Sequence, residues 1–100
     1  MDTETDADTA DAATLFALLG HPIRLGVVRA LLDVDELTVR ELNERLPGSD
    51  NSLSQHLSKL RLSKLLTARR EGMTYAYRIT DARLAAIVAA ALHPSSEPSA

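Results

Sequence analysis

The hydrophobic periodicity of this 100-residue chain changes once, after Leu65, and that change limits the folds the chain can adopt. Before it, apolar residues recur at the three- and four-residue spacing of amphipathic helices. After it, the segments Leu66–Arg70 and Tyr75–Ile79 alternate in period two, as half-buried strands do. Glu71-Gly72 lies between them, and glycine can take the positive φ of a tight turn. The pattern therefore predicts several helices followed by a β-hairpin.

Turn and capping residues divide the helical part into four segments before the hairpin and one after it. Each segment carries an apolar stripe with helical spacing. Gly20 and Pro47-Gly48 are expected to end helices, and Pro22 suits the first turn of one. The expected N-caps are Thr38, Ser49 and Asp81. The expected order is α-α-α-α-β-β-α, which is a mainly α fold with a β-hairpin (α+β).

Two short helices joined near Leu46–Ser49 and followed at once by a hairpin are the parts of a winged helix-turn-helix. The length allows one domain, which we expect over residues 9–93. We expect a disordered acidic leader at residues 1–8 and a disordered tail at 94–100, because both are polar and low in apolar residues. This fold class directs attention to the fourth helix.

The fourth helix carries the candidate DNA-reading face. Leu53, Leu57 and Leu60 share one side of it, so the opposite side is exposed. The side chains on that face and its flanks are small, polar or basic: Ser49, Asn51, Ser52, Ser54, Gln55, His56, Ser58 and Lys59. Gln55 can pair with adenine through two hydrogen bonds, and Lys59 suits a phosphate. The same composition also occurs on ordinary solvated helix faces.

The hairpin adds basic charge near this face. Arg69 and Arg70 adjoin the turn, so at least one guanidinium is held near the tip, within reach of a phosphate or the minor groove. The net charge of −3 is unevenly distributed along the chain. Met1–Asp11 has five acidic and no basic side chains. Ser49–Arg78 has six Lys or Arg against two acidic residues. Because charges act locally in salt, double-stranded DNA is the expected partner.

His56 lies on the side of the fourth helix, and the sequence allows two roles for it. One is contact with a phosphate, in which case a proton gained near DNA makes binding pH-sensitive. The other is plain packing against neighbouring structure. Of the two, the sequence favours plain packing.

The last helix is apolar on nearly every side, which indicates burial on more than one side. We therefore expect a homodimer through the first and last helices, although packing within one subunit is the alternative. The expected interface residues are Leu15, Phe16, Leu19, Leu84, Ile87, Val88, Ala91 and Leu92. Two-fold symmetry would place the reading helices about 34–36 Å apart, which matches a palindromic operator.

Several segments resemble the ArsR/SmtB-type (arsenical-resistance-repressor) family of winged helix-turn-helix regulators. They are Leu18–Arg24, Glu36–Leu42, Ser49–Arg61, and Arg69–Gly72 followed by Tyr75–Tyr77, within about residues 13–92. The resemblance implies a dimeric transcriptional repressor that binds its operator when free and releases it when an effector binds. Relatives often have Gly where the fourth helix ends. Lys64 here is expected either to adopt a left-handed conformation or to end the helix differently.

No metal or other cofactor is expected. The chain has no cysteine, which excludes thiolate ligands and thiol redox sensing. Where relatives carry cysteine ligands, this chain has Thr38 and Arg40. Where they carry histidines on the last helix, it has Arg83 and Pro94, so we interpret Asp81 as a helix cap.

Other classes of function find little support in the sequence. The longest apolar run, Leu84–Leu92, is too short to cross a bilayer, and Met1–Asp11 has no signal-like stretch, so we expect a cytoplasmic protein without membrane contact. No nucleophile and base arrangement indicates an enzyme. The alternative is a winged-helix protein-interaction module that does not bind DNA. The effector, the operator and any competition between the acidic leader and DNA remain open.

Overall fold

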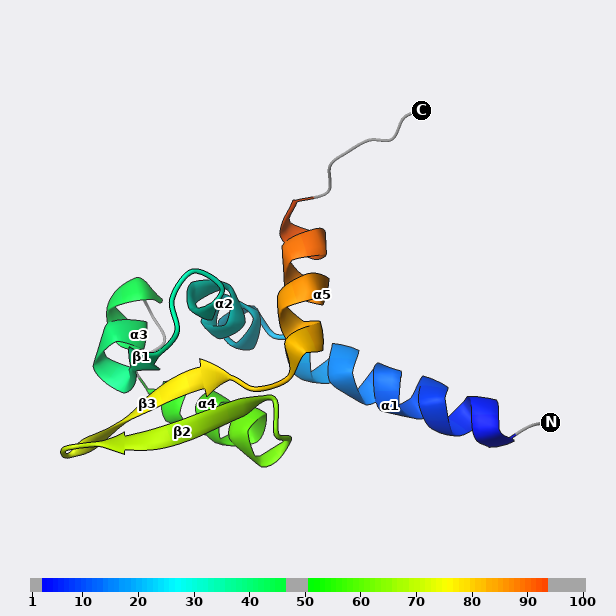
Figure 1. Ribbon diagram of the computed structural model, residues 1–100, viewed down its shortest axis with the longest axis horizontal. Helices are drawn as coiled ribbons and strands as arrows, with labels where there is room; N and C mark the ends of the chain where they lie inside the picture. The colour runs from blue at the N-terminus through cyan, green and yellow to red at the C-terminus, as the bar shows by residue number, and fades with distance from the viewer. Residues whose placement is uncertain (1–2, 47–50, 94–100) are drawn as a thin grey trace.

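The computed structural model describes residues 3–46 and 51–93 and has the order that the sequence predicts, with one additional strand (Figure 1). Its elements are α1 (Thr3–Leu19), α2 (Pro22–Leu31), β1 (Leu37–Thr38), α3 (Val39–Arg45), α4 (Leu53–Leu62), β2 (Leu66–Glu71), β3 (Thr74–Ile79) and α5 (Ala82–Leu92). Strand β1 was not predicted, because two residues are too few to show a period.

Side-chain caps fix the starts of three helices. The N–H of Ile23 donates to Nδ1 of His21 at 3.1 Å, which caps α2. Thr38 and Glu41 form the expected capping box: the Glu41 N–H donates to Thr38 Oγ1 at 3.1 Å, and the Thr38 N–H donates to Glu41 Oε1 at 2.8 Å. Asp81 accepts from the Arg83 N–H at 3.0 Å and caps α5 as predicted.

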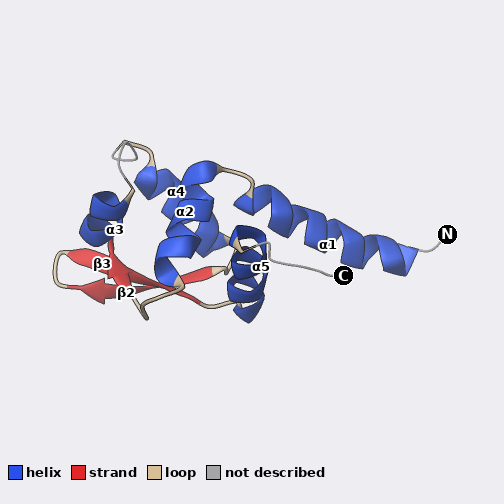
Figure 2. Ribbon diagram, turned by 90° about the horizontal axis from the view of Figure 1, so that it is seen from above, coloured by secondary structure: helices blue, strands red, loops and turns tan. Residues whose placement is uncertain are grey.

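Helix α1 begins at Thr3, so it includes residues 3–8, where the sequence predicts disorder. Acidic side chains in a first turn are favoured by the helix dipole, and alanine has the highest helix propensity. Both views show α1 projecting away from the hairpin of the same subunit (Figures 1 and 2). The predicted tail at 94–100 lies outside the described residues.

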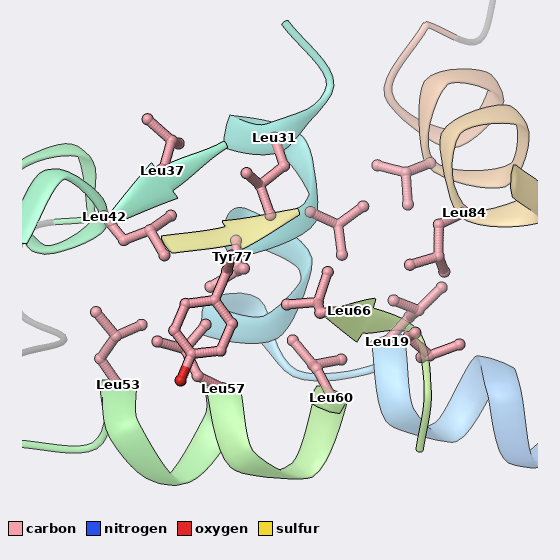
Figure 3. Close-up of a cluster of buried hydrophobic side chains, with 14 of the residues drawn as sticks. Leu19, Leu31, Leu37, Leu42, Leu53, Leu57, Leu60, Leu66, Tyr77 and Leu84 are labelled. Carbon is pink, nitrogen blue, oxygen red and sulfur yellow. The ribbon is translucent and has the colours of Figure 1, made fainter. Parts of the chain in front are cut away.

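The core joins all the elements through buried leucines and valines (Figure 3). The predicted stripe of α4, Leu53, Leu57 and Leu60, is at most 1% exposed. Figure 3 shows the Tyr77 ring of β3 lying over Leu53 and Leu57, which attaches the sheet to α4. Burial of each such leucine contributes about 1.5–3 kcal/mol, so the orientation of α4 against the hairpin is firmly set.

The sheet has the order β1-β3-β2 and is antiparallel throughout. Thr74 pairs with Glu71, which leaves Gly72 and Met73 as a two-residue turn. Gly72 has a φ of 62°, so the sharp turn uses the left-handed region that glycine tolerates. The turn thus lies one residue beyond the predicted Glu71-Gly72, because Glu71 still pairs within the hairpin, and Met73 stands 97% exposed at its tip.

Four of the predicted dimer residues face their own subunit instead of solvent. Leu15, Leu19, Leu84 and Val88 are buried in the core that α1 and α5 share with the rest of the domain. The same stripes that suggested an interface thus contribute to the core of the single subunit. Phe16 and Ala91 are exposed, and Ile87 and Leu92 are half-buried.

Among the described residues, no single helix combines the length and apolar character needed to span a membrane. One pair of helical segments, Asp6–Leu19 and Pro22–Leu31, has the required length and apolar character only when the two are combined, and they are bent by 91° relative to each other.

Candidate nucleic-acid interface

Helix α4 presents a polar surface opposite its leucine stripe. Ser54, Gln55 and Lys59 are exposed, Ser58 is half-buried, and these four residues line one shallow depression. Their side chains are hydroxyl, amide and ammonium groups, which can donate to base edges and phosphates. The structure thus brings together the central residues of the predicted reading face.

The beginning of this face differs from the prediction. Helix α4 starts at Leu53, with Ser52 at the N-cap position, so Asn51 and Ser52 precede the helix instead of forming its first turn. Ser52 makes no side-chain capping hydrogen bond, and Asn51 is exposed. Ser49, the predicted cap, lies outside the described residues. Asn51 and Ser52 therefore lie at the N-terminal end of the face, beside the depression.

The register of the hairpin separates the two predicted wing arginines. Cross-strand partners in an antiparallel pair point to the same side of the sheet. Arg70 pairs with Tyr75, on the side that carries Tyr77 against α4, whereas Arg69 pairs with Ala76 on the other side. The Arg70 Nε donates to the Gly72 carbonyl at 3.1 Å, and its guanidinium lies 5.9 Å from the centre of the Tyr75 ring. Arg70 is therefore held at the tip, on the side of α4.

Arg69 is occupied by two carboxylates. Its Nη2 lies 2.7 Å from an oxygen of Glu36 and 2.7 Å from an oxygen of Glu71, and its Nε donates to the second Glu36 oxygen at 3.1 Å. These hydrogen bonds raise the pKa of Arg69 and lower the pKa of Glu36. Two negative charges outweigh one positive charge here, so Arg69 is not a free cation for DNA.

Sequence reasoning missed two residues that adjoin this surface. Arg61 of α4 and Tyr75 of β3, with Ala68 and Tyr77, line a notch of about 190 Å³ between α4 and the wing. A signal for both was present in the sequence. Arg61 follows Ser54 by seven residues, which places the two on one flank of α4. Tyr75 precedes Tyr77 by two residues, which places both on one face of the strand.

His56 packs against His21, the N-cap residue of α2. Its ring centre lies 4.2 Å from that of His21, with the two rings tilted by 44°. Burial, followed by the neighbouring basic groups His21, Arg24 and Lys59, lowers the pKa of His56. The ring is therefore neutral in the free protein near pH 7.

Asp81, the residue considered for a metal, is engaged by Arg83. The Arg83 Nη2 lies 2.7 Å from a carboxylate oxygen, and the hydrogen bonds from the side chain and backbone of Arg83 lower the pKa of Asp81. Across 3–46 and 51–93, no three His, Asp or Glu residues gather in a way that could hold a metal ion. The carboxylate serves as a cap and an ion-pair partner.

The sequence is similar to several characterised regulators. It is 35% identical over 85 residues to the transcriptional activator HlyU of Vibrio cholerae, covering 85% of this chain and 78% of HlyU. It is 36% identical over 78 residues to the biofilm growth-associated repressor of Xylella fastidiosa, covering 78% and 68%. It is 39% identical over 66 residues to the arsenical resistance operon repressor of Escherichia coli, covering 66% and 56%.

Two solved structures share the fold. Reduced HlyU from Vibrio cholerae has a TM-score of 0.82 and 32% identity, covering 94% of this chain and all of that one. The transcriptional repressor BigR from Xylella fastidiosa has a TM-score of 0.79 and 34% identity, covering 90% and 92%.

The fold, the α4 face and the wing define a winged helix-turn-helix protein that regulates transcription by binding DNA, and not an enzyme. The helix-turn-helix domain model matches residues 19–69. With the relatives above, this shows that the chain belongs to the ArsR/SmtB-type family of transcriptional regulators, as the sequence resemblance implied.

Proposed function

We propose that the protein is a dimeric cytoplasmic repressor that binds a palindromic operator through α4 and the wing of each subunit. The observation that carries this is the position of the α4 face, which three buried leucines turn outward beside Arg70. An α-helix fits the major groove of B-DNA, and a basic hairpin beside it reaches the flanking backbone or minor groove.

Within this surface the residues divide by chemistry. Gln55, at the centre of the exposed face, is placed to read a base through its amide. Lys59, Arg61 and Arg70 are placed for phosphates, with Tyr75 supporting Arg70. The remaining predicted contacts share short polar or imidazole side chains: Ser49, Asn51, Ser52, Ser54, His56 and Ser58. Arg69 is left out of the proposal because Glu36 and Glu71 already neutralise it.

The dimer is proposed through the solvent side of α1 and α5. Phe16 is 58% exposed, a large apolar side chain in water, and Ala91 on α5 is also exposed. Ile87 and Leu92 are half-buried and extend the same apolar character. Covering such side chains with a second copy removes apolar area from water, at about 25 cal/mol per Å². We retain these four residues for the interface.

Regulation by metal thiolates is excluded from the proposal, because the chain contains no cysteine. The signal that releases DNA is therefore of another kind. The names of the relatives include both repressors and an activator, and we favour repression because it is the mode that the family resemblance implies.

The test is an in vitro selection of duplexes from a random pool, followed by titration of the enriched duplex and a scrambled duplex of equal composition. We expect an enriched palindrome that binds more tightly than its scrambled form. Gln55→Ala should weaken binding to the palindrome by about 1–3 kcal/mol and relax one base preference. Absence of duplex binding at low salt would instead support the protein-interaction alternative.

A further inference from the structure

A cluster of basic side chains lies where the start of α2 meets one flank of α4. His21 and Arg24 come from α2, and His56 and Lys59 come from α4. The two imidazole rings are in contact, at 4.2 Å between centres. We refer to these four residues as the α2–α4 basic cluster.

Two nitrogen atoms of this cluster are buried without a hydrogen-bond partner in the described part of the chain. They are Nε of Arg24 and Nδ1 of His56. A buried polar group without a partner is destabilising by about 1–3 kcal/mol. The groups that lower the pKa of His56 besides burial are all basic: the N-cap residue His21, Arg24 of α2 and Lys59 of α4. Among the described residues, no carboxylate appears with them, so the cluster combines two cationic side chains with two imidazole rings, which is the chemistry of an anion site.

The tautomers of the two histidines follow from their surroundings. Nδ1 of His21 accepts the Ile23 N–H, so it carries no proton while the cap of α2 is intact. In His56 the buried nitrogen is Nδ1, which leaves Nε2 as the nitrogen that can reach a ligand. His56 caps no helix, so its ring can gain a proton without the loss of a capping hydrogen bond.

The position of the cluster on α4 matches one strand of a bound duplex. At about 100° per residue, His56 lies on one flank of the helix and Arg61 on the other, with Gln55 between them. A helix in the major groove has a phosphate backbone along each flank. The notch at Arg61 and Tyr75 faces one strand, and the α2–α4 basic cluster faces the other.

We propose that the α2–α4 basic cluster binds a backbone phosphate of duplex DNA, and that His56 takes up a proton when it does so. The inference rests on the proposed DNA-binding function and adds Arg24 to the interface. A phosphate supplies the missing negative charge and accepts hydrogen bonds from His56 Nε2 and from the guanidinium of Arg24. Neutral His56 in the free protein becomes an imidazolium beside the phosphate, and the proton comes from solvent.

The proton uptake predicts how affinity depends on pH. Burial, followed by the surrounding basic groups, lowers the pKa of His56 in the free protein, and a phosphate raises it in the complex. Between those two values the complex binds one more proton than the free protein, so affinity rises as pH falls. We expect affinity to rise about three- to fivefold between pH 8 and pH 6, because a pKa difference of about one unit limits the total gain to about tenfold.

The experiment uses the full chain and a fluorescein-labelled mixed-sequence duplex of about 30 base pairs, because phosphate contacts do not depend on sequence. The dissociation constant is measured from about pH 5.5 to 8.5 for the wild type, His56→Gln and His93→Gln. Gln keeps a donor but does not titrate. His56→Gln should flatten the pH dependence, whereas His93→Gln, an exposed residue after α5, should leave it unchanged.

A second pair of variants tests the phosphate without titration. Arg24→Gln should reduce the slope of log affinity against log salt by about 0.9, and Arg29→Gln, exposed on the same helix, should not. In the wild type, the NMR titration of His56 should move to higher pH when duplex is added. Because the NMR titration uses the wild type, the proposal can still be tested if one variant is poorly folded.

The outcomes separate this inference from the function on which it rests. If the wild type binds duplex but His56→Gln retains the full pH dependence and the His56 titration does not move, the inference is overturned and the DNA-binding function stands. If the wild type binds no duplex at low salt, both are overturned. Flattening by His93→Gln as well would also overturn it, because the effect would then be general charge.

Discussion

Arg69 and Glu36 form a two-point ion pair that joins the wing to the segment between α2 and β1. Both guanidinium contacts are within hydrogen-bond distance, at 2.7 and 3.1 Å. The pair is 33 residues apart in the sequence and connects the outer side of the hairpin to the body of the domain. It holds the wing in place, and it leaves Arg70 on the opposite side as the wing cation available to DNA.

The different surroundings of the two arginines predict different effects on binding. Arg70→Gln should weaken binding to all duplexes and lower the salt slope by about 0.9, because one phosphate contact is lost. Arg69→Gln is the matched control and should leave the slope nearly unchanged, since its charge is already compensated by Glu36 and Glu71. The measurement is fluorescence anisotropy over a salt series. A larger loss for Arg69→Gln than for Arg70→Gln would contradict this assignment.

Lys64 adopts the left-handed conformation that the sequence allowed for it, with a φ of 66°. The Lys64 N–H donates to the Arg61 carbonyl at 2.9 Å and the Leu65 N–H donates to the Leu60 carbonyl at 3.0 Å, which is a Schellman ending of α4. A side chain at this φ is strained. Lys64→Gly should therefore stabilise the domain by up to about 1 kcal/mol.

The control for that prediction is Gly72, which is also left-handed in the described part of the chain. Its φ is 62° and no atom lies within 4 Å of an added Cβ, so Gly72→Ala introduces backbone strain without a clash. It should destabilise by about 1 kcal/mol. Urea unfolding of both variants measures the two changes. A lower midpoint for Lys64→Gly would show that the loop before β2 is not strained at this residue.

Local pattern accounts for most of what the sequence could predict. The stripe of Leu53, Leu57 and Leu60, the capping box at Thr38 and the hairpin turn at Gly72 each depend on residues close together in the chain, and each is observed. The start of α1 was misplaced because a low apolar content indicates disorder, although the same residues favour a helix by propensity and dipole.

Contacts between distant segments could not be predicted in the same way. The pairing of Arg69 with Glu36 and the ring contact of His21 with His56 depend on how elements pack, which periodicity does not specify. The dimer residues Leu15 and Leu84 show a related limit, because both are buried within their own subunit. A buried stripe in the sequence does not say whether it is covered by its own subunit or by a second copy.

The proposed dimer is tested at the exposed residues of α1 and α5. Phe16→Glu and Ala91→Glu place charges on the surface without emptying the core, so each subunit should stay folded. We expect these variants to sediment as monomers at micromolar concentration while the wild type sediments as a dimer. Met73→Glu, at the fully exposed tip of the wing, is the control and should remain dimeric. A monomeric wild type would remove the dimer from the proposal.

His56 also makes the stability of the free domain depend on pH, in the direction opposite to its effect on DNA affinity. Burial and the neighbouring basic groups lower its pKa below the ordinary value of about 6.5, so the unfolded chain binds more protons than the folded one between these two values. Stability should therefore fall as pH drops below about 6.5, until the pH reaches the pKa of the folded state.

Urea unfolding between about pH 8 and 5.5 measures this loss, within a range that avoids the titration of the paired carboxylates near pH 4. His56→Gln should remove most of the slope, and His93→Gln should retain it. One proton on one ring thus opposes folding in the free protein and favours the complex, because the phosphate replaces repulsion by Arg24 and Lys59 with attraction. If the stability of the free domain does not change with pH across this range, the claim that protonation of His56 opposes folding is contradicted.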